Sequence, residues 1–253
     1  MPHCLRLKNQ FFVGGEKGHL MSKKVELKID WASFEAAKYA CQNWHYSEVI
    51  PVGKLVKVGV WENGKFIGVV IYGRGANNNM LKPFGLTADQ GCELVRIALT
   101  NHKSPVSKIM ALSIKFLKKS NAGLKLIVSY ADQDQNHHGG IYQATNWVYS
   151  GLMNAGTMGA FMIKGKKIHP KSVHSKGVKQ TILEVRKHLD PNATVFYTKG
   201  KHRYLMALDK ETKESILPLS KPYPKRAKEQ ELEYPSGLGG ATPTCTLQLN
   251  NKL

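Results

Sequence analysis

The sequence predicts an α/β protein with one mixed central sheet and helices on both faces of the sheet. Three observations support this prediction. Strand-like and helix-like segments alternate from residue 25 to residue 151, the nearly continuous apolar run 124–132 is typical of a central strand, and Asn63-Gly64 joins two β-rich runs. A chain of 253 residues that is 42% hydrophobic can bury one sizeable core. It contains no GxGxxG or GxxxxGKS/T loop, so neither a Rossmann nor a P-loop nucleotide site is supported.

Local spacing and capping residues predict the first elements. Residues 25–29 read as a strand, and the Asp30 carboxylate is expected to cap the helix that follows. Apolar residues recur at helical spacing from Phe34 to Trp44, and Pro51 marks the break after this helix.

A hairpin is predicted over 55–73, because Asn-Gly suits a type I′ turn. A strand over 92–100 and an amphipathic helix over 104–120 follow, with Ser104 expected to cap this helix ahead of Pro105. The later elements are a strand at 124–132, a short helix at 139–146, a strand at 147–151, a helix at 179–189, and strands at 193–198 and 202–209.

We predict three regions along the chain. Residues 1–22 are expected to be a disordered leader, and Met21 near its end reads as a second possible translation start. Residues 23–217 are expected to form the folded domain, which ends in a basic helix–strand–strand portion. Residues 218–253 are rich in Pro, Lys and Gly and are expected to form a flexible tail.

Charge indicates a polyanionic partner. The formal net charge is +19, and residues 164–228 hold 17 Lys and Arg against 5 Asp and Glu, a difference of 12. A concentrated basic excess is typical of proteins that bind nucleic-acid phosphates, although a solvated basic surface is the alternative. The four cysteines form no CxxC pair, which argues against structural zinc and favours the cytoplasm. No apolar run is long enough to cross a membrane.

Several segments carry a resemblance to known families. The order of elements and the segment IYQATNWVYSG (141–151) resemble the GNAT acyltransferase fold, in which a tyrosine begins a helix after a central strand. The segments NWHYSEVIP (43–51), CELVRIALT (92–100), VSYADQDQNHHGG (128–140) and KHRYLMALD (201–209) are similar to the Mom family of phage DNA-modification proteins. This resemblance covers roughly residues 25–226.

The resemblance implies a GNAT-like fold and conversion of the adenine N6 amine in DNA to a carbamoylmethyl form, which protects DNA against restriction nucleases. It also implies an acyl-CoA such as acetyl-CoA, Fe(II), and double-stranded DNA with a flipped adenine. For a phage-encoded enzyme this places the protein in the cytoplasm of the bacterial host. The oligomeric state stays open, with a homodimer as one alternative.

The candidate catalytic residues follow the predicted strand and helix ends, where sheet enzymes place their chemistry. Tyr142 is expected to donate or accept a proton, and Asp132 to act as a base. His45 is expected to ligate the metal, with Asp132 and Glu93 as the candidate carboxylate ligands. Arg96 is expected to bind an anion and Glu93 to point to the opposite face, with Tyr46 beside His45. Structural roles remain the alternatives: packing for Tyr142 and His45, a turn for Asp132, and a salt bridge for Arg96.

Two further sets of residues are predicted to bind ligands. The region after strand 92–100 lacks the Q/R-x-x-G-x-G/A loop that holds coenzyme A in GNAT enzymes, and this departure disfavours the standard mode of acetyl-CoA binding. The phosphate contacts left there are Lys103, Ser104, Ser107 and Lys108. The residues predicted to bind DNA are Lys164, Lys166, Lys167, Lys171, Lys176, Lys199, Lys201, His202 and Arg203.

Three functions are therefore compared. The first is a Mom-like DNA-modifying enzyme. The second is a GNAT acetyltransferase that acts on a small amine or a protein, which the missing glycine loop disfavours. The third is a DNA-binding protein without enzymatic activity. This function fits the charge but does not explain why polar residues gather at strand ends.

Overall fold

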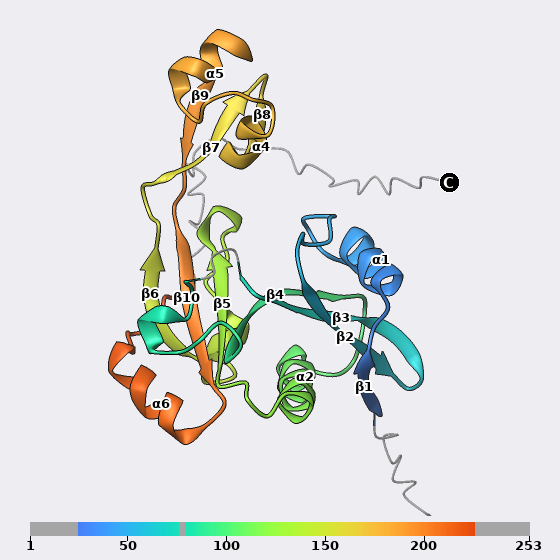
Figure 1. Cartoon of the computed structure of the whole chain (residues 1–253). Helices are drawn as coiled ribbons and strands as arrows, with labels where there is room; N and C mark the ends of the chain where they lie inside the picture. Colours follow the sequence, from blue (N-terminus) through green and yellow to red (C-terminus); the bar gives the residue numbers. More distant parts are fainter. Residues whose placement is uncertain (1–24, 76–78, 226–253) are drawn as a thin grey trace, which may run out of the picture. The chain divides into compact units, whose positions relative to one another are not determined.

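The computed structural model describes residues 25–75 and 79–225, and its elements belong to a unit that ends at Tyr223. The predicted leader and the tail from residue 226 lie outside the described residues. Seven strands form the main sheet (Figure 1), in the order β1-β2-β3-β4-β5-β10-β6. Their bounds are β1 Leu27–Trp31, β2 Leu55–Glu62, β3 Lys65–Gly73, β4 Gly91–Leu99, β5 Leu126–Asp132, β6 Val148–Met153 and β10 Lys201–Ala207.

Only β4 and β5 are parallel neighbours in this sheet. The helices that cover it are α1 Phe34–Trp44, α2 Val106–Ser120, α3 Gly140–Gln143 and α6 Lys210–Ile216. Helices α2 and α3 pack on one face, against Val70, Tyr72 and Ile127. Helices α1 and α6 pack on the other face, where alternate residues of the same strands lie. The predicted mixed α/β sheet with helices on both faces is therefore confirmed.

A second, three-stranded sheet was not predicted. It has the order β8-β7-β9, with β7 Met158–Ile163, β8 Lys166–Ile168 and β9 Thr194–Tyr197. Helices α4 Pro170–His174 and α5 Ile182–His188 pack on it. Its core consists of Phe161, Val173, Val178, Val185 and Ala193. We call residues 157–199 the basic module.

The predicted hairpin turn is confirmed, whereas the residues predicted to cap α1 and α2 are wrong. Asn63 and Gly64 both have positive φ, as a type I′ turn requires. Helix α1 is capped by Ser33, whose hydroxyl accepts the Ala36 N–H at 3.1 Å, whereas Asp30 lies inside β1. Helix α2 begins after Pro105 without a side-chain cap, so Ser104 does not cap it.

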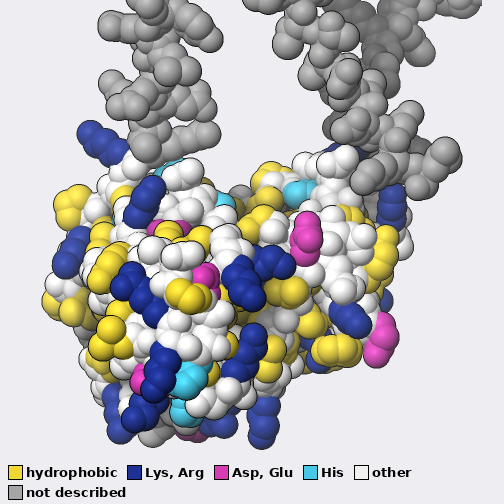
Figure 2. Space-filling view, turned by 90° about the horizontal axis from the view of Figure 1, so that it is seen from above, with side chains coloured by type: hydrophobic (Ala, Val, Ile, Leu, Met, Phe, Trp, Pro, Cys, Tyr) yellow, Lys and Arg dark blue, Asp and Glu magenta, His cyan; other side chains and the backbone are white. Residues whose placement is uncertain are grey.

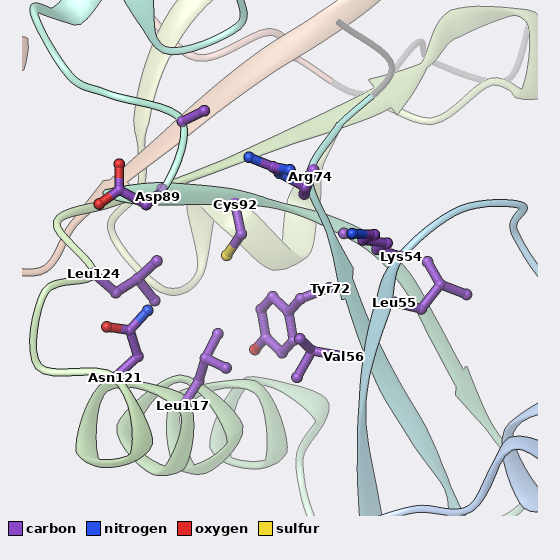
Figure 3. A pocket seen from close by; sticks show the side chains of 13 residues that line it. Lys54, Leu55, Val56, Tyr72, Arg74, Asp89, Cys92, Leu117, Asn121 and Leu124 are labelled. Atoms are coloured by element: carbon purple, nitrogen blue, oxygen red, sulfur yellow. The ribbon is translucent and has the colours of Figure 1, made fainter. Parts of the chain in front are cut away.

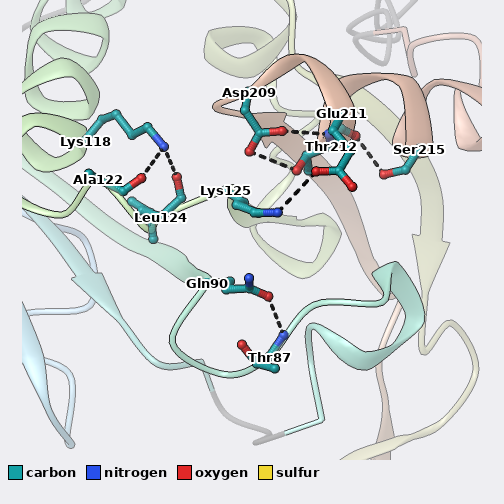
Figure 4. A network of polar contacts seen from close by, with 10 residues as sticks. All are labelled: Thr87, Gln90, Lys118, Ala122, Leu124, Lys125, Asp209, Glu211, Thr212 and Ser215. Carbon is teal, nitrogen blue, oxygen red and sulfur yellow. Dashed lines mark hydrogen bonds and ion pairs between the residues drawn. The ribbon is translucent and has the colours of Figure 1, made fainter.

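Polar contacts tie the ends of the elements together. Lys118 donates hydrogen bonds to the carbonyls of Ala122 and Leu124, which follow the end of α2 (Figure 4). Asp209 caps α6 by accepting the Thr212 N–H at 2.8 Å. The folded unit extends beyond the predicted domain end at residue 217, because Lys221 N–H bonds to Tyr149 and Tyr223 bonds to the Trp147 carbonyl. In the described ranges, no helix is both long and apolar enough for a membrane span.

Candidate functional site

A cavity opens where the parallel strands β4 and β5 separate. Their pairing runs from Gly91–Leu126 to Leu94–Ser129. At this last pair the Ser129 hydroxyl donates a hydrogen bond to the Leu94 carbonyl at 2.8 Å. The cavity beyond it has a volume of about 510 Å³. Four predicted catalytic residues and two further histidines are among its lining residues: His45, Tyr46, Arg96, Tyr142, His102 and His137.

Tyr142 reaches this cavity from α3, a helix of about one turn. Gly139 precedes the helix at φ +82°, and a Cβ there would lie 2.3 Å from the Tyr204 ring, so only glycine fits. The Tyr142 side chain is 8% exposed, and its hydroxyl hydrogen-bonds to the Ser129 hydroxyl at 2.7 Å. Burial raises the pKa of Tyr142 to about 12, against the effect of the Ser129 hydrogen bond. The phenol therefore stays protonated at neutral pH and can donate a proton.

Three aromatic rings form a row on one side of the cavity. The His45 and Tyr46 ring centroids are 4.3 Å apart, and those of Tyr46 and His137 are 5.4 Å apart. Burial, with the nearby charge of Arg96, lowers the pKa of His45 to about 4. His45 is thus neutral at pH 7, and its Nδ1 is hydrogen-bonded to the Ser47 hydroxyl at 2.8 Å. Because Tyr46 is 60% exposed, its ring is accessible to a planar ligand.

Arg96 and Glu93 both lie against the loop that follows α1. The Arg96 guanidinium donates hydrogen bonds to the Ser47 hydroxyl and the Val49 carbonyl. Glu93 lines a smaller cavity that this same loop helps to form. The prediction that these side chains point to opposite faces is wrong, because the register with β3 shifts at Val95 and adds one residue to β4.

Asp132 ends β5 near the ring row and has two partners of its own. Its carboxylate accepts the Asp134 N–H at 2.9 Å and lies 3.7 Å from the Lys201 ammonium. Burial is the main cause that raises the pKa of Tyr46, and the negative charge of Asp132 is the second cause. The Asp132 carboxylate therefore interacts electrostatically with the Tyr46 hydroxyl. The turn role and the site role predicted for Asp132 are compatible.

The start of α2 is closed by a carboxylate from the hairpin. Glu62, 8% exposed, accepts the N–H groups of Lys103 at 2.9 Å and Ser104 at 2.8 Å, and Pro105 has no N–H to offer. The Lys103 N–H is the main cause that lowers the pKa of Glu62, which therefore stays ionised. A pyrophosphate at this place would compete for the same donors and meet a negative charge. Two of the four predicted acyl-CoA contacts, Lys103 and Ser104, therefore have backbone N–H groups that a carboxylate already binds, while no contact of Glu62 engages Ser107 or Lys108.

The predicted Fe(II) site does not fit the described residues either. Across 25–75 and 79–225, no three His, Cys, Asp or Glu side chains come together as metal ligands. Because Nδ1 of His45 is hydrogen-bonded to Ser47, only its Nε2 could ligate a metal, and with Asp132 this makes two possible protein ligands. We therefore derive no step through a metal.

Two predicted DNA contacts are structural. His202 is 5% exposed, and its ring nitrogens hydrogen-bond to the Tyr149 hydroxyl at 2.9 Å and the Gln133 amide at 3.0 Å. Arg203 is half-buried and donates from Nε to the Ser150 hydroxyl at 2.7 Å. The His202 side chain is therefore not accessible to a phosphate, whereas the half-buried Arg203 is held by Ser150 through Nε alone.

The predicted lysines divide into paired and exposed residues. The Lys167 ammonium lies 3.8 Å from the Asp134 carboxylate and 3.4 Å from the centroid of the Phe196 ring. Lys201 pairs with Asp132. Of the predicted lysines in the described part of the chain, those that are exposed and whose ammonium groups form no salt bridge are Lys164, Lys166, Lys171, Lys176 and Lys199.

A second cavity, of about 360 Å³, lies at the opposite end of β4 (Figure 3). Lys54 and Arg74 line it on one side, and Tyr72, hydrogen-bonded to Ser113 at 2.7 Å, lines it on another. Burial raises the pKa of Cys92 to about 12, so this thiol is protonated and unreactive. No predicted catalytic residue lines this cavity.

Sequence patterns carry only weak signals for three residues near the candidate site. Ser129 lies inside β5, three residues before its end, and reads as a weaker candidate than Asp132. His137 stands beside His138 in the sequence, but its contact with Tyr46 joins two loops that are distant in sequence. Glu62 reads as an ordinary hairpin residue, and only the tertiary structure brings it to α2.

Comparison with known proteins gives one family match. The model of the Mom protein family matches residues 26–225. A putative acetyltransferase from Acinetobacter baylyi ADP1 is a similar solved structure, with 11% identity and a TM-score of 0.43, covering 81% of this chain and 100% of that one. No curated protein matches the sequence.

Proposed function

Because the chain belongs to the Mom protein family, we propose that it is a phage-type transferase that modifies adenine in double-stranded DNA. The N6 amine of a flipped adenine would receive a carbamoylmethyl-type group, and the product would protect the DNA from restriction nucleases. The observation that carries this proposal is the cavity between β4 and β5, where a protonated tyrosine, an arginine and an exposed aromatic ring meet.

The ring row supports binding of an extruded base. An adenine inside a duplex has its N6 edge in the major groove and must leave the stack before an enclosed site can react with it. Tyr46, with His45 and His137 beside it, offers an accessible aromatic face for stacking. The cavity of about 510 Å³ is of the size that binds small ligands.

The proton steps follow from the protonation states. As N6 forms its bond to the carbon of the donor, it must lose a proton, and the Asp132 carboxylate beside Tyr46 is the base that we assign. The departing group must gain a proton, and Tyr142 supplies it, since burial keeps the phenol protonated. The Ser129 hydroxyl positions the Tyr142 hydroxyl through its hydrogen bond.

Two contacts bear on the chemistry of the group donor. Arg96, fixed by Ser47 and Val49, places a cation in the cavity that fits a carboxylate or phosphate of the donor. Glu62 at the start of α2 argues against a coenzyme A thioester held by its pyrophosphate. The same contact weakens the alternative of an ordinary acetyltransferase.

The test is nucleoside mass analysis of plasmid DNA from cells that express the chain. Wild type is expected to yield a heavier deoxyadenosine. Tyr142→Phe removes only the hydroxyl and should lower its amount by about 10²-fold or more, the usual cost of losing a general acid. Asp132→Asn should also lower the amount, and the turn at Asp134 should survive because the amide oxygen still accepts its N–H.

A matched control separates chemistry from packing. Tyr149→Phe removes another buried tyrosine hydroxyl, the one bonded to His202, outside the cavity. This variant is expected to keep the modified nucleoside. Equal loss in Tyr149→Phe and Tyr142→Phe, or full activity in a folded Tyr142→Phe, would remove Tyr142 from the mechanism.

A further inference from the structure

The basic module has a hydrophobic core of its own, separate from the cores of the main sheet. Its core is formed only by its own residues, and Phe161, Val173 and Val185 are fully buried. Residues 157–199 contain 9 Lys and Arg against 2 Asp and Glu, a difference of 7. Lys and Arg clearly outnumber Asp and Glu on the face shown in Figure 2.

Both acidic residues of the module are used within it. Asp190 accepts the N–H groups of Lys164 at 2.6 Å and Asn192 at 2.9 Å, which fixes a turn. Glu184 lies 3.3 Å from His188 on α5. Among the described residues, Lys167 is the one module cation with a salt bridge to a carboxylate. The surface charge of the module is therefore not neutralised by its own acids.

The exposed lysines are spread over the β7–β8 hairpin and α4. Lys164 occupies the hairpin tip at φ +49°, followed by Gly165 at φ +73°, so its side chain projects from a tight turn. Lys166 continues the hairpin, and Lys171 and Lys176 lie on and just after α4. Tyr197 is the large aromatic residue of the module that is exposed, at 63%. Many lysines with little aromatic surface suit a phosphate backbone rather than unstacked bases.

The module is attached to the loop that serves the cavity. Asp134 accepts hydrogen bonds from the Thr198 hydroxyl at 2.7 Å and the Lys199 N–H at 2.9 Å. This loop follows Asp132 and continues to His137, which contacts Tyr46 in the ring row. A ligand held on the module is therefore held beside the candidate site.

We propose that the basic module grips the phosphate backbone of duplex DNA through Lys164, Lys166, Lys171 and Lys176, and so holds the duplex at the cavity. The proposal rests on the proposed function for its ligand, and it names the surface that binds this ligand. The paired Lys167 serves to attach the module to Asp134 instead of binding phosphate.

The test compares two variants of the full chain that remove the same charge. The first changes Lys164, Lys166, Lys171 and Lys176 to Gln. The control changes four exposed lysines outside the module, at positions 38, 65, 115 and 213, to Gln. Binding to a short adenine-containing duplex is measured over a salt series. The slope of log K against log salt should fall by about one for each lost lysine contact in the first variant and stay unchanged in the control.

Equal slopes in the two variants, or tighter binding of a single strand than of the duplex, overturn the proposal. Because binding is the readout, this result is independent of catalysis. A module variant that loses duplex affinity, in a protein that yields no modified nucleoside, would sustain the DNA surface and reject the proposed chemistry. If the cells yield a modified nucleoside and the module variant binds DNA as wild type does, the proposed chemistry stands and the proposed DNA surface is rejected.

Discussion

Glu62 joins the hairpin to the segment just before α2, and its replacement tests this interpretation of the site. Glu62→Ala removes hydrogen bonds from the N–H groups of Lys103 and Ser104, which lie at 2.9 and 2.8 Å from its carboxylate. Hydrogen bonds to a charged group contribute about 1.5–3 kcal/mol each. Since water reaches the opened site, we expect a total loss of about 2 kcal/mol, and a smaller loss in Glu62→Gln, which keeps one acceptor oxygen.

Urea unfolding of the full chain measures this loss, with Glu214→Gln as the control because Glu214 is exposed and pairs only across 3.8 Å with Lys210. The folded protein lowers the pKa of Glu62 below 4.5, so its contribution is present above that value and is lost as pH falls through the folded pKa. The difference between wild type and Glu62→Gln should therefore shrink in acid. A Glu62→Ala protein as stable as wild type at neutral pH, or a difference that does not depend on pH, would refute the reasoning.

Three further outcomes are expected. Wild type should show no saturable calorimetric binding of desulfo-coenzyme A, because Glu62 holds the amides that a pyrophosphate needs; tight binding would contradict this. The His45 ring should titrate near pH 4 by NMR, and stability should fall as pH drops from 6.5 towards that value, since the unfolded imidazole takes up the proton first; a value near 6.5 would place His45 in solvent. In urea unfolding, Gly139→Ala should lower the free energy of unfolding more than Gly177→Ala does. Both glycines have positive φ, but only at Gly139 would the new Cβ lie 2.3 Å from the Tyr204 ring. Equal losses in the two variants would show that this contact does not matter.

Local position in the sequence located two candidate residues that the structure brings to one cavity. Tyr142, at the start of a helix after a central strand, and His45, just past the end of α1, both reach the same cavity. These residues lie at element ends that periodicity and turn residues can locate. Their ionisation states could not be predicted, because the pKa values depend on burial and on neighbours distant in sequence.

The sequence by itself determined the fold class, the β2–β3 hairpin, the central place of β5 and the basic character of the C-terminal half. Each of these depends on patterns within a few residues: alternation, the Asn63-Gly64 turn, a continuous apolar run, or a sum of charges. Only the tertiary structure decided that Glu62 binds the N–H groups just before α2, that an added residue at Val95 turns Glu93 and Arg96 to one side, and that His202 is buried. These features arise from contacts between segments that are far apart in the chain. A pattern within one segment does not specify which residues of other segments its side chains will contact.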